Sequence, residues 1–236
     1  MKLMRIAGLT LWLSLPLSAA NDPLFIPPQP PEEAATLGVV YRTIVGREAQ
    51  VTFTSDAPVE DIVGKSNEVA GYAIVGPGEG PPTILKAEWA LPVDSLATGI
   101  PLRDEHMVSK EWLDAESFND IRFKLAALEE VSAIKQGEDF STWSVTLVGE
   151  MTLHGVTRTM RVPDARLSFL KESDRTRSIA PGDLMLLRCD YEVRLSDFGV
   201  RHRDVPDKVS DTIQLSQLLR LSTAIDPAPS QARPDR

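Results

Sequence analysis

The sequence of 236 residues contains one cysteine, Cys189, and no apolar run long enough to span a bilayer. A single cysteine cannot form an internal disulfide, so the stability of the fold must come from buried apolar surface. Cys189 is therefore expected to be a small buried hydrophobic side chain. The apolar run from Ile6 to Leu17 falls short of the ~20 residues that a transmembrane helix needs, so we expect no integral membrane segment in the mature chain.

Basic side chains are also in short supply, because 25 Lys and Arg oppose 34 Asp and Glu and give a formal net charge of −9 at pH 7. An acidic surface repels phosphate backbones, which argues against nucleic acid as a partner. The three histidines, His106, His154 and His202, are scattered without the short spacings that place two zinc ligands on one turn. No metal site is expected.

Catalytic motifs are missing as well. The sequence has no Gly-x-Ser-x-Gly nucleophile elbow, and Cys189 stands between Arg188 and Asp190 in the middle of a strand-like segment. Residues 64–66, Gly-Lys-Ser, are similar to the end of a phosphate-binding loop, but Val59 occupies the place of the first glycine of that loop. We therefore expect no enzyme, no catalytic residues and no cofactor.

The first twenty residues have the pattern of a secretory signal peptide. Lys2 and Arg5 supply a positive start, an apolar run follows, and residues 18–20, Ser-Ala-Ala, form a small-residue cleavage site. The mature chain is expected to begin near Asn21, with a net charge of −11 once the two basic residues are removed from the −9 of the whole sequence. This pattern predicts a periplasmic or secreted protein.

Prolines and small polar residues gather at both ends of the mature chain. Residues 21–35 are expected to form a Pro-rich linker and residues 223–236 a disordered tail. The sequence between them, residues 36–222, has the length of one all-β domain, because barrels and sandwiches reach roughly 200 residues without splitting.

Apolar and polar residues alternate with a period of two through most of this domain. The alternation is clearest over residues 143–153, and it recurs over 85–93, 189–195 and 213–221. Such segments are typical of strands with one apolar face, and about eight of them predict an all-β barrel or sandwich. The apolar stripe by itself leaves open whether it forms a packed core or the wall of a cavity.

One segment, residues 95–119, breaks this alternation. The spacing from Asp104 to Leu113 predicts a helix, with Asp104 as its N-cap. The apolar side chains of Met107, Leu113 and Phe118 would be buried if the segment crossed an open end of a barrel. We therefore expect a helical crossing that acts as a lid.

Three parts of the sequence resemble the YceI-like family. They are residues 91–123, with the run Asp-Glu-His-Met at 104–107, residues 149–158, with Leu-His-Gly at 153–155, and residues 195–199, Leu-Ser-Asp-Phe-Gly. They occur in the order of the family, and the resemblance extends over residues 53–221. It implies an extended antiparallel eight-stranded barrel of lipocalin type whose apolar interior holds a polyisoprenoid, an isoprenoid quinone or a fatty amide.

A cavity of this kind makes inward-facing residues candidates for contact with a small apolar lipid. His106, next to Met107, is the candidate for a headgroup contact, although it could instead tie the crossing to a strand. Two other functions stay open, an enzyme that acts on a lipid in the same cavity and a ligand-free structural domain. Two copies could also pair through strand edges as a homodimer. The candidate ligand-binding residues are Phe53, Trp89, Leu91, His106, Met107, Leu113, Phe118, Phe123, Trp143, Val145, Leu147, Met151, Tyr191 and Val193.

Overall fold

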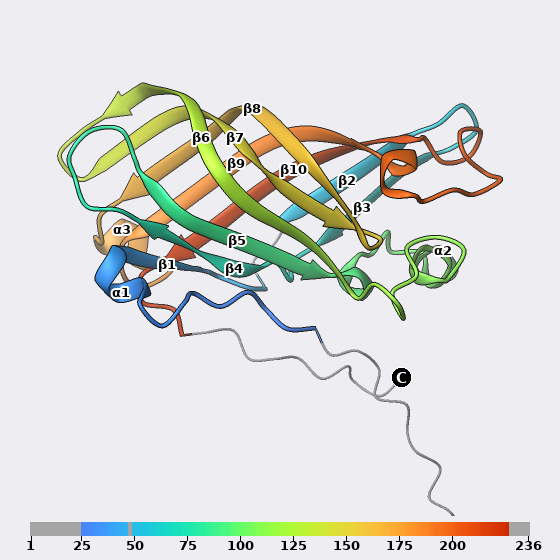
Figure 1. Ribbon diagram of the computed structural model, residues 1–236, viewed down its shortest axis with the longest axis horizontal. Helices are drawn as coiled ribbons and strands as arrows, with labels where there is room; N and C mark the ends of the chain where they lie inside the picture. The colour runs from blue at the N-terminus through green and yellow to red at the C-terminus, as the bar shows by residue number, and fades with distance from the viewer. Residues whose placement is uncertain (1–24, 47–48, 227–236) are drawn as a thin grey trace, which may run out of the picture.

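A computed structural model of the chain describes residues 25–46 and 49–226 (Figure 1). The expected signal peptide lies outside the described residues, as does most of the expected C-terminal tail. In the described part of the chain, ten strands form one antiparallel sheet. The strands are β1 (Val39–Thr43), β2 (Val51–Asp56), β3 (Asp61–Ser66), β4 (Ala70–Val75), β5 (Ile84–Pro92), β6 (Asp120–Gln136), β7 (Phe140–Leu153), β8 (Val156–Leu170), β9 (Leu184–Arg194) and β10 (Thr212–Ser222).

Helical segments in the same part of the chain are short. They are α1 (Ala34–Leu37), η1 (Val93–Ser95), α2 (Pro101–Val108), α3 (Asp174–Arg177) and η2 (Leu195–Phe198). Figure 1 places α1 and α3 at one end of the sheet, and it places α2, the β2–β3 hairpin and the loop before β10 at the other end. The two ends of the molecule are therefore covered by different elements.

The sheet closes on itself because β10 pairs with both β1 and β2. Thr43 of β1 lies opposite Leu221 of β10, and residues 51–55 of β2 lie opposite residues 213–217. Since β4 pairs with β1 and β3 pairs with β2, β1 and β2 are two parts of one bent strand, and β3 and β4 are two parts of the next. Counted in this way, the sheet is the predicted eight-stranded antiparallel barrel, and a closed barrel leaves fewer unpaired strand edges.

The alternation in the sequence appears as alternation in burial. On β9, Cys189 and Val193 are buried while Asp190 and Glu192 are exposed, as expected for successive side chains that point to opposite faces. β10 lies beside β9 in continuous register, from Thr212 opposite Arg194 to Ser222 opposite Leu184. The inward rows of the two strands therefore meet side by side inside the barrel.

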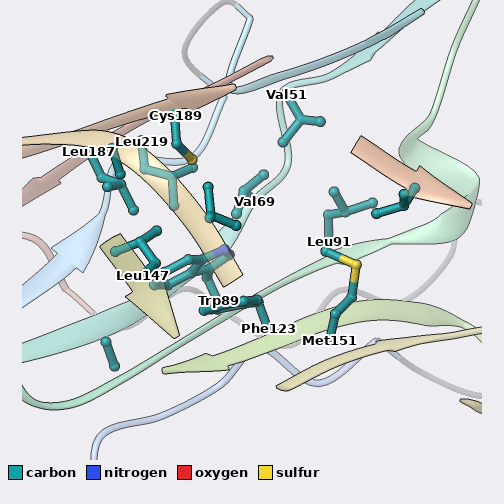
Figure 2. Packing of buried hydrophobic residues seen from close by; sticks show 14 of the residues in the cluster. Val51, Val69, Trp89, Leu91, Phe123, Leu147, Met151, Leu187, Cys189 and Leu219 are labelled. Carbon is teal, nitrogen blue, oxygen red and sulfur yellow. The ribbon is translucent and has the colours of Figure 1, made fainter. Parts of the chain in front are cut away.

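Inward side chains fill one half of the barrel. Leu219 and Leu221 of β10 lie opposite Leu187 and Met185 of β9, and all four are at most 3% exposed. Figure 2 shows Leu147, Leu187 and Leu219 on one side of Trp89, with Leu91 and Met151 on the other side. The packed core thus occupies the end near α1 and α3, and the residues that line the cavity lie beyond Trp89.

The helix of the crossing differs from its expected position. It begins at Pro101, not at Asp104, and it ends at Val108, before Leu113. Proline suits the first position of a helix because its missing N–H has no intrahelical partner there. The Asp104 carboxylate instead binds Thr98 in the preceding loop. It accepts hydrogen bonds from the Thr98 backbone N–H at 2.7 Å and from the Thr98 hydroxyl at 2.6 Å.

Part of the proline-rich segment before the barrel is described, and it packs against the sheet. Phe25 is buried in a small cluster with Ala70 of β4 and Ala90 of β5. The Arg122 guanidinium also donates a hydrogen bond to the Ile26 carbonyl at 3.3 Å. Residues 25–33 therefore run along the outside of the barrel (Figure 1).

Candidate functional site

The half of the barrel under the α2 crossing contains a cavity of about 440 Å³. Its walls come from the inward faces of β2, β5, β6, β7, β9 and β10, and α2 with the turn after it lies across its end. Most of the lining side chains are apolar. Concave, largely apolar sites of roughly 300–1,000 Å³ with a few polar groups are the usual form of small-molecule sites.

Ten of the fourteen residues that the sequence singled out line this cavity. They come from β2, β5, β6, β7, β9 and the crossing, so the barrel brings together residues that are up to 140 positions apart, from Phe53 to Val193. Their contact with a ligand stays a prediction. The ten residues are Phe53, Trp89, Leu91, His106, Met107, Leu113, Phe123, Met151, Tyr191 and Val193.

The other four residues lie elsewhere. Trp143, Val145 and Leu147 are 5%, 1% and 3% exposed and belong to the packed core, beyond the inner end of the cavity. Phe118 packs edge-to-face on His154, with ring centroids 4.8 Å apart, and does not border the cavity. The apolar stripe along β7 thus belongs to the core in its first half and to the cavity in its second, and contact of these four residues with a ligand stays a prediction.

Two aromatic rings reach into the cavity because a glycine stands on the neighbouring strand. Phe53 lies opposite Gly64, and a Cβ atom on Gly64 would overlap the Cζ atom of the Phe53 ring. In the same way, a Cβ atom on Gly149 would overlap the Phe123 ring. Phe123 also stacks on Trp89, with centroids 4.9 Å apart and an interplanar angle of 22°. Offset stacking of this kind adds to the energy of burial and holds both rings in place.

The mouth of the cavity carries both exposed apolar and charged side chains. Ile100 and Leu102 line the cavity at the start of α2, yet they are 47% and 63% exposed. Arg103 on α2 forms an ion pair with Glu60, which lies just before β3. This pair connects the crossing to the β2–β3 hairpin on the opposite side of the mouth.

The three histidines have different surroundings. His106 is exposed and borders the cavity, and its ring makes no hydrogen bond or ion pair with the described residues. His202, in the loop between η2 and β10, stacks on Trp112 of the crossing. His202 and His154 therefore both contact the crossing, through Trp112 and Phe118, whereas His106 borders the cavity. Within the described residues there is no group of three or more His, Cys, Asp or Glu side chains that could hold a metal ion.

Polar side chains also lie at the inner end of the cavity. The Tyr191 hydroxyl donates to the Gln217 amide oxygen at 3.4 Å, and the Cys189 thiol lies 3.9 Å from the same oxygen. Burial, together with Asp190, raises the pKa of the Cys189 thiol to about 12. Burial also raises the pKa of the Tyr191 hydroxyl, with a smaller effect from Cys189. Both groups are therefore neutral near pH 7, and neither has the properties of an activated nucleophile or base.

The YceI-like domain model matches residues 43–220, which is most of the sequence. The chain belongs to the YceI-like family. Two solved structures share the barrel fold of this YceI-like chain. Burkholderia cenocepacia BcnA aligns with a TM-score of 0.53 and 14% sequence identity, covering 80% of this chain and 98% of that one. The Campylobacter jejuni YCEI protein aligns with a TM-score of 0.51 and 17% identity, covering 70% and 86%.

Sequence identities this low show a shared fold alone. Among curated proteins, none matches the YceI-like chain. No helix in the described part of the chain has the length and apolar content needed to cross a bilayer.

Several residues of the YceI-like cavity were not anticipated from the sequence. Trp112 and Leu102 belong to the crossing, which was expected over the mouth, but neither residue was among the candidates. On β10, Ile213 and Leu215 continue the inward apolar row and could have been included on that basis. Gln217 interrupts the same row, and a polar residue within an apolar stripe is the signal that could have identified it.

Proposed function

We propose that this YceI-like chain is an exported lipid-binding protein that sequesters or carries a long apolar ligand, such as a polyisoprenoid, an isoprenoid quinone or a fatty amide. The observation that carries the proposal is the apolar cavity of about 440 Å³ inside a closed barrel, with α2 across its end. The resemblance to a family whose members hold such lipids supports the same conclusion.

Transfer of hydrocarbon out of water supplies the affinity in this proposal. Each buried CH₂ group contributes about 0.8 kcal/mol, and part of this gain is offset by the entropy lost when a flexible chain is ordered. A shallow surface groove would leave much of such a chain in contact with water. A cavity enclosed by strands on all sides and covered by a crossing fits the shielding of a lipid in an aqueous compartment.

The proposed role is binding without catalysis. Tyr191 and Cys189 are the titratable groups at the inner end, and burial keeps both of them protonated near neutral pH. The charged groups at the mouth pair with each other, as Arg103 does with Glu60 and Lys208 with Asp204 at 3.5 Å. Such pairs neutralise charge at the rim and do not poise a base or a nucleophile next to the apolar wall.

The experiment is to purify the protein from its native host, extract it with chloroform and identify the extracted molecules by mass spectrometry. A stoichiometric long-chain lipid is expected. Delipidated protein should then gain ~2.7 kcal/mol of stability from a ligand at 100 times its dissociation constant. For a domain of this size, that gain raises the melting temperature by roughly 5–10 °C.

Two results would replace this proposal. If the extract contains no lipid and no chain length shifts the melting curve, the chain is a ligand-free structural domain. If the purified protein converts a bound lipid with multiple turnovers, it is an enzyme that uses the same cavity.

Export is the second part of the proposal, and it rests on the pattern of residues 1–20. Mass analysis of the protein from the periplasm or the medium should give an N-terminus within a few residues of Asn21. Recovery of the protein with Met1 intact would contradict export.

A further inference from the structure

One polar side chain stands out on the inward face of β10. The neighbours of Gln217 on this face are Leu215 toward the mouth and Leu219 toward the packed core, and the Gln217 residue is only 3% exposed. It is the innermost residue of β10 that lines the cavity, since Leu219 and Leu221 do not border it. The amide therefore lies at the floor, where the hollow half of the barrel meets the core.

The hydrogen bonds of this amide are incomplete. Its oxygen accepts from the Tyr191 hydroxyl at 3.4 Å and is approached by the Cys189 thiol at 3.9 Å. Its nitrogen, Nε2, has no hydrogen-bond partner among the described residues, although Gln217 borders the cavity. Buried polar groups in proteins are nearly always paired, because leaving a donor unpaired in an apolar site is unfavourable.

We infer that Gln217 and Tyr191 form a headgroup site at the floor of the cavity, which takes an uncharged carbonyl oxygen at the end of the apolar ligand. The Gln217 nitrogen donates to this oxygen, and the Tyr191 hydroxyl keeps the amide oriented by binding its oxygen. This inference rests on the proposed function and deepens it. It places the polar end of the ligand deepest in the barrel and the far end of the chain toward α2.

The surroundings of the floor select against a charged headgroup. The basic residues that line the cavity lie near its mouth: Arg103 is on α2 and Lys208 is in the loop before β10. Arg122, at the start of β6, is held by Glu88 and Asp120 at 2.7 and 2.5 Å. A phosphate or carboxylate at the floor would have no counter-charge there, and burying an unpaired charge is far more costly than burying an amide or a ketone.

The chemistry of the floor also selects against a plain hydrocarbon. A hydrocarbon would fill the apolar walls equally well but would leave the Gln217 nitrogen without a hydrogen-bond partner. A ketone of a quinone ring or the carbonyl of a primary amide satisfies it. The ligand class narrows to long apolar chains that end in an uncharged carbonyl.

The test uses the delipidated full-length mature protein and three probes with the same eighteen-carbon chain. These are an octadecenamide, an octadecene and an octadecenoate, and their affinities are measured by displacement of a fluorescent lipid at pH 8. The unchanged protein is expected to bind the amide about tenfold more tightly than the alkene, the ratio that one well-placed hydrogen bond supplies. The carboxylate is expected to bind more weakly than the amide.

Gln217→Leu replaces the amide by an apolar side chain of similar size. It should bring the ratio of amide to alkene affinity close to one, mainly by tightening the binding of the alkene. Leu215→Met is the matched control, because it changes the neighbouring inward position of the same strand without changing polarity, and it should keep the tenfold ratio. Tyr191→Phe removes the hydroxyl that orients the amide and should lower the ratio in a second, independent way.

The possible failures are distinguishable. If none of the three probes binds to the unchanged protein, the proposed function itself is wrong. If the amide and the alkene bind equally, or if the carboxylate binds most tightly, lipid binding stands and the headgroup site is wrong. The same conclusion follows if folded Gln217→Leu protein keeps the tenfold ratio. Should that variant not fold, an unchanged ratio in Tyr191→Phe contradicts the inference.

Discussion

Trp112 of the α2 crossing stacks on His202 of the loop before β10, with ring centroids 4.3 Å apart and an interplanar angle of 26°. The two residues are 90 positions apart in the sequence, and their contact joins the crossing to the loop before β10, both of which contribute residues to the cavity wall. Together with the ion pair between Arg103 and Glu60, this contact ties the crossing to two different parts of the rim. We expect these two contacts to slow the release of a ligand through the mouth.

Replacing Trp112 by Ala should therefore speed ligand release. Aromatic pairs contribute about 0.5–1.5 kcal/mol beyond their buried area, so we expect dissociation of a bound fluorescent lipid to be roughly 2- to 10-fold faster. Phe118→Ala is the matched control. Phe118 also belongs to the crossing and also contacts a histidine, His154, but it does not border the cavity. Equal release rates in the two variants would show that the Trp112 contact does not restrain the mouth.

A substitution that fills the cavity should abolish lipid binding but leave stability nearly unchanged, whereas one that removes a core side chain should lower stability but leave lipid binding unchanged. Val193→Phe adds a ring where open space exists, so we expect loss of lipid binding with a change in unfolding free energy within about 1 kcal/mol. Leu147→Ala removes a side chain that is 3% exposed in the packed half, and we expect it to cost about 2–5 kcal/mol while lipid stoichiometry is kept. Urea unfolding and mass spectrometry of extracts measure both quantities. The reverse pattern would mean that the two halves of the barrel have been assigned wrongly.

The only thiol in the sequence should be unreactive in the folded protein. Cys189 is 3% exposed, and burial together with Asp190 raises its pKa to about 12, so the thiolate is rare at pH 8. Alkylation by iodoacetamide is expected to be slow in buffer and fast in urea, and intact mass should report a single adduct in urea. Rapid alkylation in buffer, at a rate near that of a free thiol, would contradict the burial of Cys189.

Alkaline pH should destabilise the barrel through Tyr41. Burial, with a smaller effect from Asp183, raises the pKa of the Tyr41 hydroxyl to about 12. In the unfolded chain the same group ionises near pH ~10, so between these values the unfolded state binds fewer protons than the folded state. The free energy of unfolding must therefore fall as pH rises from about 10 to about 12, and the contribution is fully present below pH ~10.

Comparison with Tyr41→Phe isolates this contribution, because Cys189 and Tyr191 have raised pKa values in both proteins. Between pH 9 and about pH 11.5, the unchanged protein should lose about 1–2 kcal/mol more than the variant, after allowance for partial solvent screening. Urea midpoints at the two pH values measure the difference. Parallel losses in the two proteins would show that Tyr41 ionises as it does in the unfolded chain.

The alternation in the sequence determined the strands and the presence of a crossing, and the resemblance to the YceI-like family implied the barrel. Side chains alternate faces along every strand, so the pattern at Cys189, Asp190, Glu192 and Val193 can be read without knowledge of any partner. The break in alternation over residues 95–119 likewise located the crossing between β5 and β6. The exact bounds of α2 were missed because the Asp104 side chain, a good helix cap, is engaged by Thr98 in the folded chain.

Only the tertiary structure decided where the core ends and the cavity begins. Leu147 and Met151 have the same character and lie on the same face of β7, yet the first packs against protein and the second borders open space. Whether an inward residue of β7 is packed or borders the cavity depends on which side chains of β5, β9 and β10 lie at the same level of the barrel. Those neighbours are distant in sequence. The role proposed for Gln217 depends on the same geometry. The sequence shows one polar residue in an apolar row, and only the structure shows that this residue lies at the floor of a cavity.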